Sequence, residues 1–156
     1  MKELLEYRQK LIARLAEAAR EFCAACEAVS DPFAKIEGGW TLHQIASHTR
    51  DVQKLIYGAR IERTLKEDNP RFESFDADEW MASHYDPQES LVVILNEFAS
   101  HAEGLCQTLG TLPREAWSRE SSHAELGGGL TLQLWVERSL AHITEHLIAV
   151  KRPKGG

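Results

Sequence analysis

Residues 41–65 read TLHQIASHTRDVQKLIYGARIERTL, and they carry the clearest structural pattern in the chain. Apolar side chains recur every three or four residues, as in a helix that buries one face. Thr41 can cap the first turn while Gln44 reaches back to it, as in a capping box. Asn69-Pro70 follows and closes the pattern, because proline disfavours helical geometry in the residue before it. The sequence therefore predicts a long amphipathic helix here.

Two further segments near the ends of the chain have the same period. The first covers about 2 to 29 and ends at Asp31-Pro32. The last begins at Thr131 and stops before Pro153. We expect both to be helices with one apolar face.

A fourth segment lies between them. Asp86 is expected to cap it, with Pro87 in the first turn and Glu89 completing a second capping box. Gly110 suits a left-handed residue at its C-terminal end. The predicted helix therefore covers the residues between this cap and this glycine.

Four helices of this length predict an all-α protein, an antiparallel four-helix bundle with long inter-helix loops. The connections 67–86 and 110–130 exceed ordinary loop lengths, and a short helix is expected around 76–82. Long loops are often functional, so we expect a binding mouth there. Residues 1–153 are interpreted as one domain, and 154–156 as a disordered tail.

The composition excludes several classes of protein. Of the 156 residues, 43% are hydrophobic and 27% are charged, which is typical of a folded globular chain. The net charge of −6 argues against nucleic acid or an anionic membrane as a partner. The best apolar run, 91–95, is far shorter than the ~18 residues of a membrane span. Three cysteines and no signal-peptide pattern favour the cytoplasm.

Three histidines indicate metal chemistry. His142 and His146 lie four residues apart, which places both side chains on one face of the last helix. His48 lies close to the apolar stripe of the second helix and can face them across a bundle. Three imidazoles with one position left for water form the pattern of a catalytic metal centre. The alternative is a solvated or stacked pair of surface histidines.

Asp51 follows His48 by three residues and is its neighbour on the helix. It can orient an imidazole, act as a fourth ligand, or take a proton from a metal-bound water. The alternative is a solvated carboxylate paired with Arg50 or Lys54. Both interpretations stay open at this point.

Two other motifs are weaker. The segment 142–146 fits the pattern H-x-x-E-H, with Glu145 as a peptidase base, but no further ligand follows it, so we reject that interpretation. Cys23 and Cys26 form a C-x-x-C pair deep inside the first helix. A redox role requires a helix N-terminus, and a zinc site requires a second pair, so we expect apolar packing.

The motifs together resemble those of the DinB/YfiT-like superfamily. The stretch WTLHQIASH at 40–48, followed by Asp51, is similar to its opening motif of Trp, cap, His and acidic residue. The ending AHITEH at 141–146 resembles its terminal H-x-x-x-H. The order and separation of the two motifs extend the resemblance over nearly the whole chain.

The resemblance implies an up-down-down-up bundle, often a homodimer, with a divalent ion held by His48, His142 and His146. Characterised relatives include thiol-dependent transferases and isomerases that use mycothiol or bacillithiol. A low-molecular-weight thiol is therefore a candidate cofactor here, with Arg50, Arg60 or Arg63 as anchors. Imidazole ligands suit Zn, Ni, Cu and Fe, and we expect Zn or Ni.

Three hypotheses about function follow. The first is a metal-dependent enzyme acting on a small-molecule substrate, in which the ion activates a thiol or a water and Asp51 accepts a proton or orients a ligand. The second is a non-enzymatic bundle that binds a metal or small ligand. The third is a helical interaction protein without a metal.

Overall fold

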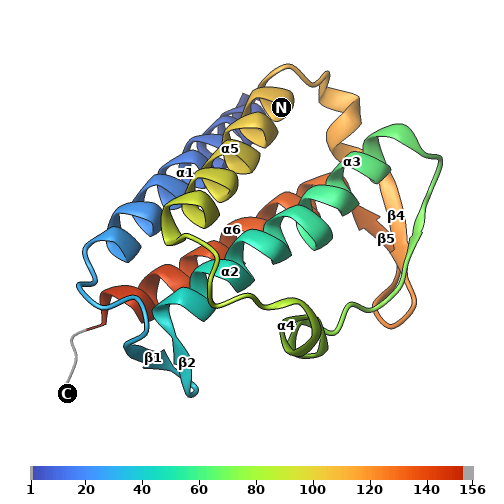
Figure 1. Ribbon diagram of the computed structural model, residues 1–156. Helices are drawn as coiled ribbons and strands as arrows, with labels where there is room; N and C mark the ends of the chain where they lie inside the picture. The colour runs from blue at the N-terminus through green and yellow to red at the C-terminus, as the bar shows by residue number, and fades with distance from the viewer. Residues whose placement is uncertain (1, 153–156) are drawn as a thin grey trace.

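The computed structural model describes residues 2–152 of the chain, and the tail expected at 154–156 lies outside them. Helices dominate the fold, and the one predicted around 41–65 forms a continuous rod of three parts, α2, η1 and α3 (Figure 1). The middle part, η1, is a π-helix, with one wider turn inside the rod. The helical elements are α1 (Lys2–Glu27), α2 (Leu42–Val52), η1 (Gln53–Gly58), α3 (Ala59–Lys66), α4 (Ala77–His84), α5 (Leu91–Gly110), the short 3-10 helix η2 (Arg114–Ser118) and α6 (Leu132–Lys151).

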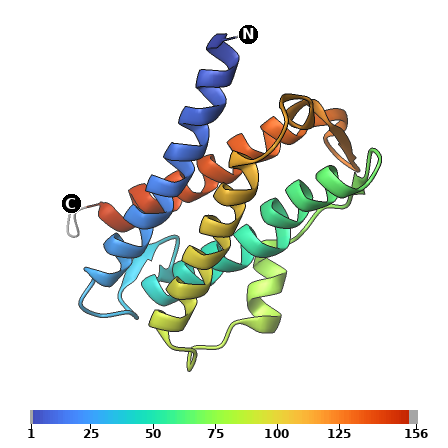
Figure 2. The same cartoon turned by 90° about the horizontal axis from the view of Figure 1, so that it is seen from above.

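The long helical segments lie side by side, and their directions follow from contacts and from the two views. α1 and α6 end, and α2 and α5 begin, at the same end of the molecule (Figures 1 and 2). α5 therefore runs opposite to α1: Cys23 Sγ lies 3.7 Å from the carbonyl of Leu95, and Cys106 Sγ lies 3.8 Å from the carbonyl of Ile12. This arrangement sets α2 against α6, which is where the predicted ligands lie.

The predicted helix starts are confirmed at two of the long segments. Thr41 accepts a hydrogen bond from the backbone of Gln44, whose side chain accepts one from the backbone of Thr41, so the capping box is complete. Thr131 caps α6 by accepting a hydrogen bond from the backbone of Leu134. The short helix expected around 76–82 is α4, capped by Asp76.

The predicted start of the third long helix was wrong. α5 begins at Leu91, with Ser90 as its cap residue. Asp86 instead accepts hydrogen bonds from the backbones of Gln88 and Glu89 and closes a turn. The side chain of Asp86 is used in this local turn, and the side chain of Glu89 binds Arg50, so neither is available for the capping box.

The other end of this helix also differs from the prediction. Gly110 is the last residue of α5 rather than a left-handed cap, and Thr111 follows in right-handed geometry. A glycine at a helix end therefore marks the boundary here without adopting the backbone angle that glycine favours.

Five short strands within residues 2–152 correct the prediction of a purely helical chain. β1 and β2 form an antiparallel hairpin, with Gly38 and Gly39 at positive φ in its turn. β4 joins β3 in parallel and β5 in antiparallel register. Each strand has two to five residues, too few to show an alternating pattern in the sequence. Their bounds are β1 (Lys35–Glu37), β2 (Trp40–Thr41), β3 (Arg71–Phe72), β4 (Glu120–His123) and β5 (Gly127–Thr131).

One apolar core joins all the long helices. Phe22 of α1 packs edge-on against Phe98 of α5, with ring centroids 5.3 Å apart. Trp135 of α6 is fully buried and donates from its indole nitrogen to the Ser121 hydroxyl, which ties α6 to the second sheet. Cys26 is also fully buried, and burial raises the pKa of its thiol to about 12. The C-x-x-C pair is thus part of the apolar packing, as predicted.

Candidate metal centre

The structure brings the three predicted histidines together between α2 and α6. Nε2 of His142 lies 3.1 Å from Nε2 of His48 and 3.1 Å from Nε2 of His146. One ligand atom from each ring lies within 4.8 Å of the others. Within residues 2–152, this is the group of side chains with the geometry to hold an ion. The one-turn spacing on α6 and the antiparallel approach of α2 produce the cluster.

The imidazoles are held in the neutral form. Burial and, to a smaller extent, the charge of His146 lower the pKa of His48 to about 4. Burial likewise lowers the pKa of His142 to about 3, with added contributions from both other rings. The pKa of His146 is lowered by burial and raised in part by nearby carboxylates. Neutral imidazole is the form that binds a metal ion.

The donor set fits a divalent ion. A tetrahedral ion with nitrogen bonds of about 2.0–2.1 Å holds its ligand atoms about 3.3 Å apart, close to the 3.1 Å separations here. The Nε2 atom of His142 has two such neighbours, and one nitrogen cannot satisfy both with well-directed hydrogen bonds. An ion accepts all three lone pairs at once. Two Nδ1 atoms, of His142 and His146, are buried with no partner among the described side chains and backbone.

A cavity of about 400 Å³ opens beside the cluster, and His146 forms part of its wall. The wall also contains Trp40 and Asp78, which come from the β1–β2 hairpin region and from α4. Trp40 meets His48 edge-on, with ring centroids 4.9 Å apart. The segment 67–86, in which a mouth was expected, therefore does contribute to the approach to the cluster.

Asp51 lies beside the cluster but outside it. One carboxylate oxygen accepts a hydrogen bond from Nε of Arg50 at 3.0 Å, and the other accepts from the indole nitrogen of Trp80 at 3.1 Å. Arg50 also binds Glu89 and Glu97. The carboxylate thus makes the predicted pair with Arg50 and links α2 to α4.

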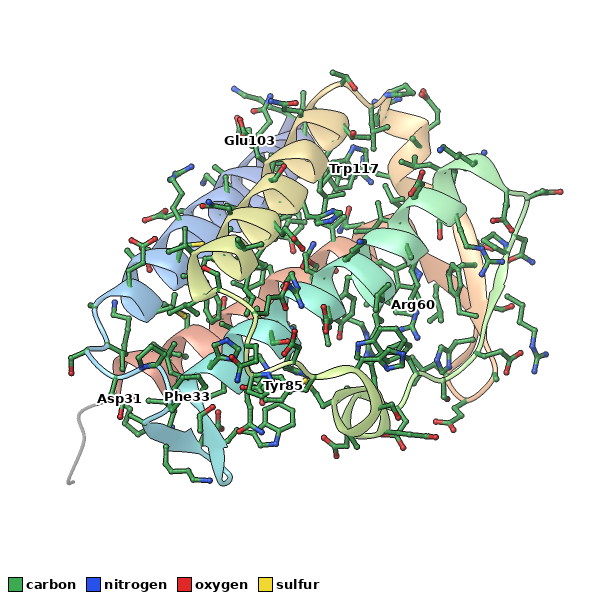
Figure 3. All side chains as sticks on the ribbon, in the orientation of Figure 1. Asp31, Phe33, Arg60, Tyr85, Glu103 and Trp117 are labelled. Carbon is green, nitrogen blue, oxygen red and sulfur yellow. The ribbon has the colours of Figure 1, made fainter. Side chains whose placement is uncertain are left out.

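His43 lies outside the cluster and links α2 to the segment that precedes α5. It is buried, with Nδ1 2.6 Å from the Tyr85 hydroxyl and Nε2 2.7 Å from the carbonyl of Glu89. Its ring stacks on Phe33, and Figure 3 labels Phe33 and Tyr85 near the start of α2. Both ring nitrogens therefore have protein partners. The remaining histidines lie outside the cluster: His84 stacks on Trp80, His101 is exposed, and His123 accepts from two backbone amides of its turn.

One residue beside the cluster was missed in the sequence. The ring of Tyr57, on the π-helical segment, lies 5.8 Å from the ring of His142. A straight α-helix does not predict this contact from the apolar spacing, because the wider turn shifts the register of all later side chains. Gly58, a glycine inside a helical pattern, is the signal that was available.

A model of the DinB superfamily matches residues 14–149. The chain belongs to the DinB superfamily. The resemblance seen in the two histidine motifs is therefore confirmed, and the DinB match contains all three clustered histidines.

A solved structure is similar to this DinB chain over most of its length. It is YfiT from Bacillus subtilis, described as "a probable metal-dependent hydrolase with an unusual four-helix bundle topology". The two share 25% identity with a TM-score of 0.71, over 90% of this chain and 86% of YfiT. A search of the curated proteins found no match. Within the described residues, each helix is too short or too polar to cross a bilayer.

Proposed function

We propose that this chain is a metal-dependent enzyme whose divalent ion, Zn or Ni, is held by His48, His142 and His146. The observation that carries the proposal is the convergence of three neutral Nε2 atoms on one point. A bound ion supplies Lewis acidity there and lowers the pKa of a water or a thiol. Three protein ligands leave a position for that group, as in catalytic zinc sites.

The surroundings favour a small-molecule substrate. The cavity beside His146, at about 400 Å³, is within the roughly 300–1,000 Å³ of ligand pockets. Activation of water agrees with the description of YfiT as a metal-dependent hydrolase. Activation of a low-molecular-weight thiol, as in a transferase or isomerase, rests on the family resemblance. The homodimer and the cytoplasmic location stay predictions of the sequence.

Asp51 belongs to the same proposal. It lies one helical turn from His48, and Arg50 and Trp80 hold its carboxylate in a fixed orientation. A carboxylate fixed in this way can orient the groups next to it or accept a proton from a bound ligand. Asp51→Asn is expected to reduce turnover while leaving the ion content unchanged.

The decisive measurement is the ion content per chain, by mass spectrometry on protein purified without a histidine tag. We expect about one ion per chain in the parent and almost none in His142→Ala, because one of three ligands is lost. His101→Ala, an exposed histidine outside the cluster, is the matched control and should keep its ion.

The same preparations separate enzyme from passive binder. We expect the loaded parent to hydrolyse an ester or amide, or to transfer one of a panel of thiols to an electrophile, and to lose this activity with a chelator. No ion in the parent after incubation with Zn or Ni would overturn the proposal. A loaded ion with four protein ligands and no exchangeable water would favour the non-enzymatic bundle instead.

A further inference from the structure

The wider turn in the α2–α3 rod determines which side chain faces the histidines. Residues 53–58 form the π-helix, and a Cβ built on Gly58 would lie 2.7 Å from the backbone carbonyl of Gln53. Contacts this short do not occur in folded proteins, so the turn requires glycine at this position. The π-turn rotates every later residue relative to a regular helix. Tyr57 faces His142 in this register.

The hydroxyl of Tyr57 is free to bind a ligand. No hydrogen bond joins it to another group in residues 2–152, in contrast to Tyr7 and Tyr85, which both have partners. A phenol is protonated at neutral pH and can donate a hydrogen bond. The ring of Tyr57 lies beside that of His142, with ring centroids 5.8 Å apart, so the phenol is a neighbour of the histidine cluster.

Two guanidinium groups accompany Tyr57. Arg60 follows it by three residues and is half-buried over the ring of Trp135, with Cζ 4.8 Å from the ring centroid. Arg138 follows Trp135 by three residues on α6 and precedes His142 by four, so it lies on the same side of that helix. The labelled Arg60 comes from the α3 part of the rod (Figure 3).

The guanidinium groups of this pair have no carboxylate partner in residues 2–152; Arg60 is half-buried and Arg138 is exposed. Arg60 donates to the backbone carbonyl of Glu73, and neither Arg60 nor Arg138 forms an ion pair with a carboxylate of the described chain. Burial lowers the pKa of Arg60, Tyr57 raises it in part, and the charge of Arg138 lowers it. Glu145 also acts on Tyr57 electrostatically, but it binds neither guanidinium. Two adjacent cations without a counter-charge favour a bound anion.

We propose that Tyr57, Arg60 and Arg138 form an oxyanion subsite beside the three-histidine cluster, which selects substrates with a carboxylate or phosphate group. This inference rests on the proposed function, because it places the anion next to the bound ion. The phenol donates one hydrogen bond, and the planar guanidinium groups offer paired donors that match such oxygens. Gly58 acts as a positioning residue, since it permits the turn that aims Tyr57.

Anion binding to the Co²⁺-loaded protein tests this inference without an activity assay. Inorganic phosphate and acetate are titrated separately while the visible spectrum of the ion is recorded. We expect Tyr57→Phe and Arg138→Gln each to weaken binding about tenfold, the size of one charge-assisted hydrogen bond. The anion that binds the parent more tightly identifies the substrate group. Arg71→Gln is the matched control, because Arg71 is exposed and paired with Glu73.

The outcomes separate this inference from the proposed function. A parent that binds no Co²⁺ removes both proposals. A parent that binds Co²⁺ and anion, with the same dissociation constant in Tyr57→Phe and Arg138→Gln, overturns the subsite alone. Gly58→Ala adds a test of positioning: we expect Co²⁺ to bind as before and anion affinity to fall, although Tyr57 is still present. If that variant does not fold, the Tyr57→Phe result decides.

Discussion

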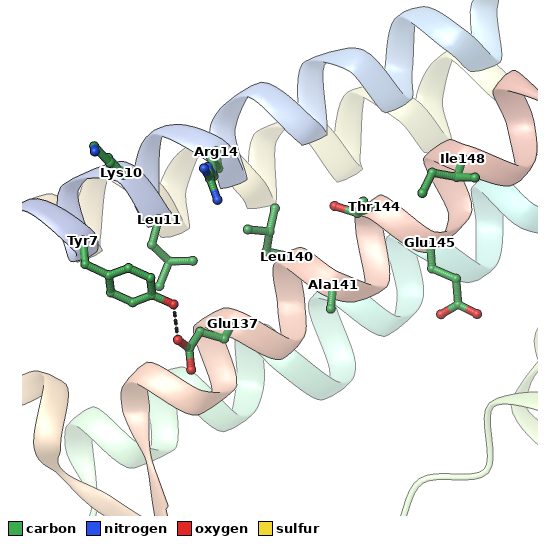
Figure 4. Close-up of a pocket in the computed structure, with 10 residues that line it drawn as sticks. All are labelled: Tyr7, Lys10, Leu11, Arg14, Glu137, Leu140, Ala141, Thr144, Glu145 and Ile148. Carbon is green, nitrogen blue, oxygen red and sulfur yellow. Dashed lines mark hydrogen bonds between the residues drawn. The ribbon is translucent and has the colours of Figure 1, made fainter.

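The two sides of α6 differ in what they offer a ligand. Toward α2, α6 presents His142 and His146, which are half-buried and have converging nitrogen atoms. Toward α1, it borders an open groove of about 670 Å³ lined by apolar side chains such as Leu140 and Ile148 (Figure 4). The groove is larger than the cavity beside His146. The larger cavity is therefore on the α1 side of α6, whereas the side chains suited to bind an ion are on its α2 side.

The difference shows why polar convergence identifies the site better than volume. Charged groups of the groove lie along its walls, with Lys10 and Arg14 on α1 and Glu137 and Glu145 on α6. The Tyr7 hydroxyl donates to the Glu137 carboxylate at the rim (Figure 4). These groups are solvated or paired, whereas the three imidazoles are largely removed from water and contact one another. Strongly shifted pKa values at converging atoms are the usual mark of a functional site.

The largest effect expected from this comparison is the pH dependence of the metal-free protein. The pKa values of His48 and His142 are about 4 and about 3 in the folded state, against 6.5 when unfolded. The unfolded chain therefore binds more protons below pH 6.5, and the free energy of unfolding decreases as pH falls. Each histidine accounts for at most about 1.4 kcal/mol per pH unit, so about 4 kcal/mol is lost by pH 5.

Urea unfolding of chelator-treated protein between pH 7.5 and 5 measures this dependence. His142→Ala should flatten the curve, whereas the exposed His101→Ala should leave it as in the parent. Loading with a metal should move the loss to lower pH, since the ion holds the imidazoles neutral. A parent whose unfolding free energy is constant over this range would show that the imidazoles are hydrated, as on the groove side.

A smaller effect is expected from one substitution made on each side of α6. Ile143 is fully buried, and Ile148 is 56% exposed beside the groove. Ile143→Ala should lower the free energy of unfolding by about 3 kcal/mol through lost burial and a new cavity. Ile148→Ala should change it by less than about 0.5 kcal/mol.

Denaturation midpoints of the two variants and the parent, at two protein concentrations, provide the measurement. Equal losses for both variants would contradict the view that the groove side is solvated. If the loss for Ile148→Ala also grew with protein concentration, a second copy of the chain would be covering the groove, as the predicted homodimer allows.

The sequence was most informative where one residue type has one physical role. Helical periodicity predicted the long helices, and Thr41 and Thr131 predicted two of their starts. The i,i+4 spacing of His142 and His146 placed both rings on one face of α6. His48 could be added because a bundle can place its helix beside the helix of His142 and His146, which is the arrangement found.

The sequence was least informative where tertiary contacts decide between local alternatives. Asp86 had the spacing of a helix cap, yet Glu89 is bound by Arg50 and His43, and the helix starts later. The π-turn that places Tyr57 beside His142 shifts the helical register of the residues after it. The spacing of apolar residues in the sequence does not reveal this shift. Strands of two to five residues leave no pattern at all.

The smallest effect is expected at the rim of the groove. Tyr7→Phe removes the hydrogen bond to Glu137, which is exposed to water, so the unfolding free energy should fall by less than about 1 kcal/mol. The bond to Glu137 also raises the pKa of Tyr7, because an ionised phenol would lose the bond and be repelled by the carboxylate. Absorbance titration at high pH should show one late-ionising tyrosine fewer in the variant. Ion content should be unchanged, and a loss of ion in Tyr7→Phe would mean that the two sides of α6 are coupled through the helix.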